Sequence, residues 1–140
     1  MKLHFIKYAW LLVFVSAAGL AQTTPVKIVF DVTSKDSLTH QAAMRHVSGM
    51  TASYPESEFE VVVYGGALPM FITNESTVAK GIRELENNKN VSFKVCAATM
   101  KRYNVDKSKL LPKVVIVPDA IIEIVNKQKQ GWGYIKEAHN

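Results

Sequence analysis

Cys96 is the single cysteine of this 140-residue chain, and its setting favours chemistry at the thiol. It follows Val91–Val95, an apolar run typical of a strand, and precedes a helix-like segment that carries Lys101 and Arg102. The start of a helix has free N–H groups and a partial positive charge, which favour a thiolate over a thiol, and Lys101 and Arg102 would add to this effect. Ala97 and Ala98 are small enough to leave room for a group on the sulfur. The expected chemistry is nucleophilic, as in sulfur transfer or thiol exchange.

The same cysteine also fits a structural role. A free cysteine is among the side chains most often buried, where it behaves as a small apolar group. With one cysteine the chain cannot form an internal disulfide, so its stability must come from core packing. The residues alone leave both roles of Cys96 open.

The elements that must position Cys96 alternate between strands and helices. Strands are predicted over 26–32, 58–64, 91–95 and 114–117, and helices over 38–53, 73–88, 97–103 and 118–130. The strands are apolar and rich in β-branched residues, which is typical of a parallel sheet buried on both faces. The sequence therefore predicts an α/β fold with a mainly parallel sheet sandwiched by helices.

Three of these helices carry an apolar stripe at helical spacing, which should face the core. The stripes consist of Ala43, Val47, Met50 and Tyr54 in the first helix, of Val78, Ile82 and Leu85 in the second, and of Ile121, Ile124 and Val125 in the last. The tail Trp132–Lys136 would either fold back on the core or contact another subunit, and its aromatic residues favour the subunit contact.

Ligands of open α/β sheets bind beyond the carboxyl ends of the strands. Four loops, over 31–37, 65–70, 96–99 and 118–119, lie at such ends. They include Asp31, Gly65, Gly66 and Cys96, which are far apart in the sequence. We therefore expect these residues to line one edge of the sheet and to form a candidate site there.

The chain shows no convincing pattern for a metal or a cofactor. Asp36 and His40 are four residues apart, but no third ligand accompanies them, so a helix cap and a solvated histidine are expected instead of a metal site. Gly65 and Gly66 lack the spacing of a phosphate-binding loop. Neither a metal nor a cofactor is predicted.

The first 21 residues have the pattern of a secretory signal peptide. Lys2 and Lys7 precede the apolar run Ala9–Leu20, and small residues occupy positions 19 and 21. An uncleaved membrane anchor is the alternative, but the run is shorter than the roughly 20 apolar residues that span a bilayer. Residues 22–140 would then form a single domain, periplasmic or secreted, without a stable membrane span.

The charge of the chain argues against nucleic acid as a partner. The formal net charge is +5, and the basic residues are interleaved with acidic ones in place of a dense basic patch.

Four segments together resemble the DsrE/DsrF-like family. They are KIVFDVTSKDSLTHQAAMRHVSGM, FEVVVYGGALPMF, VSFKVCAATMKRYNV and LLPKVVIVPDAIIEIVNKQKQGWGYIK, and the resemblance runs from about residue 26 to residue 136. It implies an α/β domain with flavodoxin-like layers that assembles into homo- or hetero-oligomers. It also implies a sulfur-relay role in which Cys96 carries a persulfide between a donor and an acceptor protein.

The expected function is thus that of an exported DsrE-like protein which binds or relays sulfane sulfur on Cys96. A non-enzymatic, oligomeric binding or scaffold domain with a buried structural cysteine is the alternative. A third hypothesis is a small-anion or metabolite binder that uses the strand-end loops without the thiol.

Overall fold

The computed structural model describes residues 24–138, and the signal peptide expected over 1–21 lies outside this range. Among residues 24–138, no helix has the length and the apolar character needed to cross a bilayer.

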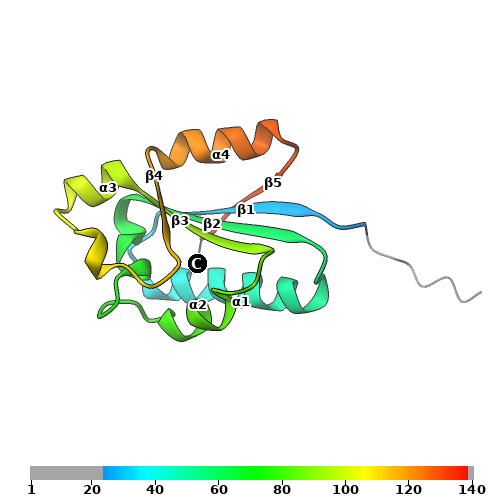
Figure 1. Ribbon diagram of the computed structural model, residues 1–140, viewed down its shortest axis with the longest axis horizontal. Coiled ribbons are helices and arrows are strands. Elements are labelled where there is room, and N and C mark those ends of the chain that lie inside the picture. The colour runs from blue at the N-terminus through cyan, green and yellow to red at the C-terminus, as the bar shows by residue number, and fades with distance from the viewer. Residues whose placement is uncertain (1–23, 139–140) are drawn as a thin grey trace, which may run out of the picture.

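Five parallel strands form one sheet in the order β4-β3-β2-β1-β5. The strands are β1 (Lys27–Val32), β2 (Glu58–Val63), β3 (Val91–Cys96), β4 (Val115–Val117) and β5 (Gly133–Lys136). The helices are α1 (Ser37–Ser53), α2 (Ala79–Leu85), α3 (Ala97–Arg102) and α4 (Ala120–Lys129), with short 3-10 helices η1 (Gly65–Phe71) and η2 (Lys107–Lys109). Figure 1 shows α1 and α2 on one face of the sheet and α4 on the other, which confirms the predicted α/β fold.

The two faces of the sheet have different chemistry. The face toward α1 and α2 carries the main core, in which the rings of Phe71 and Phe93 meet edge to face at 5.8 Å. The face toward α4 carries a much smaller apolar cluster, made of Val29, Val62, Cys96, Ala120 and Ile124. Cys96 therefore belongs to the thinner layer, and α4 is the helix that covers it.

A buried ion pair supplements the small apolar contact of α4. Glu60 lies in the middle of β2 and is 1% exposed. Its carboxylate forms an ion pair with Lys127 Nζ at 2.9 Å and accepts a hydrogen bond from Ser92 Oγ at 2.8 Å. Lys127 also lies 4.3 Å from the centre of the Trp132 ring. The pKa of the neighbouring Glu123 is raised, first by burial and then by a hydrogen bond with Glu60 and by the charge of Glu60. A polar, charge-paired cluster thus holds the second half of α4 against the sheet.

The apolar stripe predicted for α4 is wrong in two of its three residues. Ile124 is buried, but Ile121 is 57% exposed and Val125 is also exposed. The face of α4 that meets the sheet is instead formed by Ala120, Ile124 and Lys127, because Glu60 requires a cation opposite it. In α1, Tyr54 leaves the predicted stripe because it caps the helix end before Pro55 and is half exposed.

The second predicted helix, over 73–88, is shorter than expected and spans only Ala79–Leu85. The Thr73 N–H donates to the carbonyl of Lys109, and Ile72 forms a bridge with Leu110, so the start of the segment pairs with a distant loop. The Ser76 hydroxyl also accepts from Val78 N, a local turn that competes with helix formation.

The tail forms a fifth strand, which the sequence analysis did not predict. Residues Gly133–Lys136 pair in parallel with β1 at the edge of the sheet, and all four are exposed. Within the described chain, the tail therefore folds back onto the sheet.

Replacing Lys127 with Met should destabilise the fold by about 3 kcal/mol, because the buried carboxylate of Glu60 would lose its cation. Urea unfolding followed by circular dichroism measures the effect. Lys129→Met is the matched control, since Lys129 is an exposed lysine of the same helix and should change stability little. Equal unfolding midpoints for the two variants would contradict the role given to the ion pair.

Candidate functional site

Cys96 ends β3 and is the N-cap residue of α3. It is 5% exposed, and it lines a cavity of about 250 Å³ at the carboxyl edge of the sheet. The cavity is lined by Tyr64, Gly65, Cys96, Ala98, Thr99, Arg102, Asp119, Ala120 and Ile121. The thiol is therefore recessed, but it belongs to the wall of a cavity of small-molecule dimensions.

The surroundings of the sulfur favour the thiolate. Burial works against a charge on Cys96, but hydrogen bonding from the backbone of Ala120, from the backbone and side chain of Thr99 and from the backbone of Ala98 outweighs it and lowers the pKa of the thiol. Asp119 caps α4 by accepting from the N–H groups of Ile121 and Ile122, which leaves that of Ala120 available to the sulfur. Two helix starts, those of α3 and α4, thus meet at one thiol.

The Gly65 turn holds Thr99 in place. Gly65 N donates to Thr99 Oγ1 at 3.0 Å, so the hydroxyl proton of Thr99 remains free to point at the sulfur. Gly65 has a φ of 58°, a conformation that favours glycine. A Cβ at the next residue, Gly66, would lie 3.1 Å from the carbonyl oxygen of Thr33, so the close packing of the turn against the end of β1 favours glycine here as well.

A hydrogen-bonded network flanks the cavity at the end of β1. Buried Asp31 accepts from Tyr134 OH at 2.7 Å, from Lys136 Nζ at 3.0 Å and from Tyr64 OH at 3.4 Å. The hydrogen bond to Asp31, together with burial, raises the pKa of Tyr134 to about 12. Burial, followed by the charge of Asp31, raises the pKa of Tyr64. Tyr64 therefore stays protonated and links the network to the wall of the Cys96 cavity.

The structure brings together some of the residues named from the sequence and separates others. One cavity is lined by Gly65, Cys96 and Ala98. Asp31 does not line this cavity, but it accepts a hydrogen bond from Tyr64, which does. Gly66 lines a different cavity on the other side of the turn.

Ala97 and Lys101 do not belong to the lining of the Cys96 cavity. Arg102, the residue after Lys101, provides the cation there. The spacing of a helix accounts for Thr99, which lies three residues after Cys96 and so shares its side of the first turn of α3.

Tyr64 and Ala120 were not predicted as site residues, whereas Arg102 was predicted to favour the thiolate and Thr99 and Asp119 belong to strand-end loops named from the sequence. Asp119 and Ala120 were visible as the start of a helix, but nothing in the sequence places that start next to Cys96. The pairing of Cys96 with Val117 in the sheet is what brings them together.

The described residues offer no set of three or more His, Cys, Asp or Glu side chains that could hold a metal ion. Asp36 caps α1 as expected, through a 2.9 Å hydrogen bond from Leu38 N. His40 is buried, and its Nε2 lies 2.7 Å from the carbonyl oxygen of Ser34, so the expectation of a solvated histidine is wrong. The reactive group that this site presents is the thiol.

Comparison with known proteins agrees with this architecture. The model of the DsrE/DsrF-like family matches residues 27–136. The structure resembles MTH1491 from Methanobacterium thermoautotrophicum, a protein of unknown function, with a TM-score of 0.73 and 25% identity over 79% of this chain and 98% of that one. No curated protein matches the chain.

Two further solved structures share the fold at lower identity. The ychN protein from E. coli has a TM-score of 0.67 and 12% identity over 81% of this chain and 99% of that one. BT1422 from Bacteroides thetaiotaomicron, a conserved protein of unknown function, has a TM-score of 0.64 and 12% identity over 79% of this chain and 93% of that one.

Replacing Thr99 with Val should raise the pKa of Cys96, because the hydroxyl that favours the thiolate is lost. At neutral pH the thiolate fraction falls, so alkylation by iodoacetamide should slow several-fold and its pH profile should move to higher pH. Thr99→Ser keeps the hydroxyl and should restore the wild-type profile. Coincident profiles for the Val and Ser variants would show that the hydroxyl does not act on the sulfur.

Proposed function

We propose that this chain, which belongs to the DsrE/DsrF-like family, carries sulfane sulfur as a persulfide on Cys96. The observation that supports the proposal best is the setting of the thiol, whose pKa is lowered by hydrogen bonding at the meeting point of two helix starts. A thiolate, and not a thiol, is the nucleophile in sulfur exchange.

The transfer needs no oxidant, because the donor already contains a sulfane sulfur. The Cys96 thiolate attacks that sulfur in a persulfide or in thiosulfate, and a new S–S bond forms. The S–S bond of the donor breaks, and its electron pair leaves on a thiolate or on sulfite. In the second step an acceptor thiolate attacks the outer sulfur, and the electron pair of the breaking bond returns to the sulfur of Cys96.

The cavity supplies groups suited to such a step. Arg102 offers a positive charge to an anionic donor, and Thr99 and Ala120 face the sulfur that changes charge. Tyr64, which donates its proton to Asp31, adds a polar group to the wall of the cavity. The volume of about 250 Å³ accommodates a small donor or a single chain end of a larger one.

A specific observation favours the second candidate function, a binding or scaffold domain with a structural cysteine. Cys96 is only 5% exposed and packs with Val29, Val62, Ala120 and Ile124. A thiol that fills a small apolar cluster would contribute to stability without reacting.

Incubation of the wild-type protein with thiosulfate or an organic persulfide should add about 32 Da, the mass of one sulfur atom, to Cys96. Intact-mass spectrometry measures the adduct, and reduction with dithiothreitol should remove it. Cys96→Ser should show no adduct. Alkylation of the native protein separates the two functions: a thiol that reacts only after denaturation, with no sulfur adduct, supports the structural cysteine.

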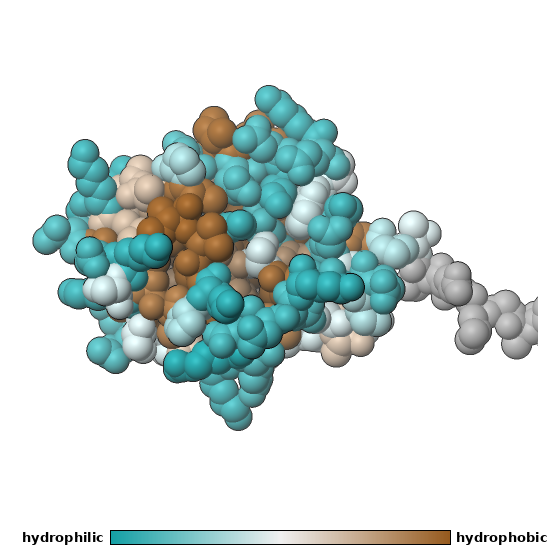
Figure 2. All heavy atoms as spheres, viewed as in Figure 1, coloured by the Kyte–Doolittle hydropathy of each residue, from teal (hydrophilic) through white to brown (hydrophobic). Residues whose placement is uncertain are grey.

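We further propose that the protein is exported and forms a homo-oligomer through α4 and the neighbouring edge of the sheet. Exposed apolar residues, Val115, Ile121, Ile122 and Val125, support this surface. Figure 2 shows apolar side chains gathered over β4 and on α4. Soluble monomers rarely expose large apolar patches, and such patches often mark interfaces.

Mass spectrometry of the protein recovered from its native host tests both proposals at once. If the protein is exported, the mass under denaturing conditions should be that of a chain that begins at Gln22. If it assembles, the mass under native conditions should be that of more than one chain. Ile122→Glu should shift the native mass to that of a monomer, because a charge would be buried in the contact. Gln128→Glu, a change at another exposed position of α4, should leave the native mass unchanged. A monomeric wild type would refute the assembly.

A further inference from the structure

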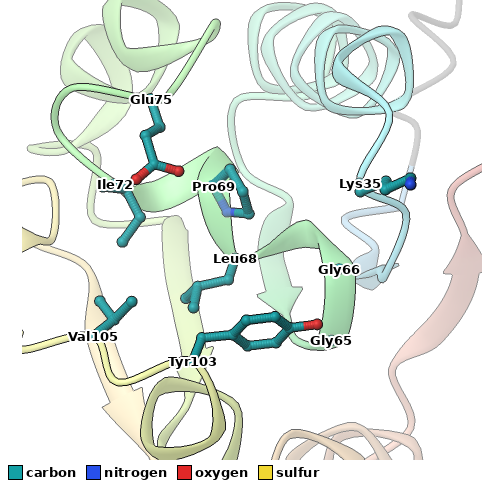
Figure 3. Close-up of a pocket in the computed structure, with 9 residues that line it drawn as sticks. All are labelled: Lys35, Gly65, Gly66, Leu68, Pro69, Ile72, Glu75, Tyr103 and Val105. Carbon is teal, nitrogen blue, oxygen red and sulfur yellow. The ribbon is translucent and has the colours of Figure 1, made fainter.

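A second cavity, of about 390 Å³, lies on the other side of the Gly65 turn from Cys96. Its walls come from η1 and from the segments that follow η1 and α3, with Lys35 at the rim. It is lined by Lys35, Gly65, Gly66, Leu68, Pro69, Ile72, Glu75, Tyr103 and Val105 (Figure 3). Its position at the carboxyl edge of a parallel sheet is the one at which α/β folds bind ligands.

The interior of this cavity is mainly apolar. Leu68, Pro69, Ile72 and Val105 provide aliphatic surface. Tyr103 is 53% exposed, and in Figure 3 its ring lies along one side with the hydroxyl directed at Gly65. A large aromatic ring that is half exposed at the side of a cavity gives a ligand a flat apolar surface to pack against.

Glu75 gives the cavity its charge. In Figure 3 the carboxylate of Glu75 points toward Ile72 and Pro69, whereas the side chain of Lys35 extends away from the cavity. Lys109 lines an adjoining cavity together with Glu75. No ion pair involving Glu75 occurs in the part of the chain that the structure describes, so its charge is available to a ligand.

We propose that this cavity binds a small organic cation, a primary amine on an aliphatic or aromatic body. The apolar body would pack against Leu68, Ile72 and the Tyr103 ring, and the ammonium group would pair with Glu75. The volume of about 390 Å³ lies within the range of small-molecule sites. The proposal uses no group of the Cys96 cavity except Gly65, and it holds whether or not Cys96 carries sulfur.

The charge preference of the site should be moderate. Glu75 is exposed at the rim, and exposed ion pairs contribute little because water screens them. We expect an amine to bind about threefold to fivefold more tightly than a neutral alcohol with the same carbon chain. The apolar contacts should supply most of the affinity.

Hexylamine, hexan-1-ol and hexanoate at neutral pH are the probes, and saturation-transfer NMR titration of the full chain measures their dissociation constants. The expected order of affinity is hexylamine, then hexanol, then hexanoate. Glu75→Gln should bring hexylamine to the affinity of hexanol without changing the affinity for hexanol. Tyr103→Ala should weaken hexylamine and hexanol alike, because it removes one wall.

Glu84→Gln is the matched control, since Glu84 is an exposed glutamate on α2 that does not line the cavity, and it should change nothing. Three results would overturn the proposal: no binding of hexylamine, tighter binding of hexanoate, or an amine preference that survives Glu75→Gln. The Cys96→Ser variant should bind hexylamine like the wild type, which keeps this test separate from that of the sulfur chemistry.

Discussion

The ion pair between Glu60 and Lys127 is the contact on which the candidate site depends. The face of the sheet that α4 covers offers only a small apolar cluster, and Lys127 of α4 neutralises the buried carboxylate of Glu60 beside it. The first residue of the same helix, Ala120, faces the sulfur of Cys96. A charge buried in the middle of β2 therefore helps to determine the environment of a thiol at the end of β3.

The chemistry at Cys96 follows from a balance between burial and hydrogen bonding. Burial alone would favour the neutral, less reactive thiol, as expected of a structural cysteine. The N–H groups of Ala120 and Ala98 and the hydroxyl of Thr99 reverse that effect, so the pKa of the thiol is lowered although the side chain is almost fully covered. The same contacts thus serve packing and nucleophilicity.

The sequence was sufficient to predict the fold because the strands are apolar and strictly alternate with helices. It was also sufficient to place Cys96 at the end of a strand, because that depends only on local pattern. The tertiary contacts were not predictable in the same way. Lys101 and Arg102 were both predicted to favour the thiolate, but the phase of a short helix places only Arg102 in the wall of the cavity.

The remaining misses have the same physical origin. The polar inner face of α4 exists because Glu60 lies beneath it, and the start of the second predicted helix is displaced because Ile72 pairs with Leu110. β5 is exposed along its whole length and so lacks the apolar signature that identified the other strands. Each of these features is determined by a partner distant in the sequence.

Gly65 is a wall common to the Cys96 cavity and to the cavity beside Tyr103. Its N–H group holds the hydroxyl of Thr99, which in turn faces the sulfur. The same turn therefore orients a hydroxyl on the Cys96 side and closes one end of the apolar cavity on the other side. A side chain at position 65 would disturb both cavities at once, because the backbone there has a φ of 58°, which favours glycine.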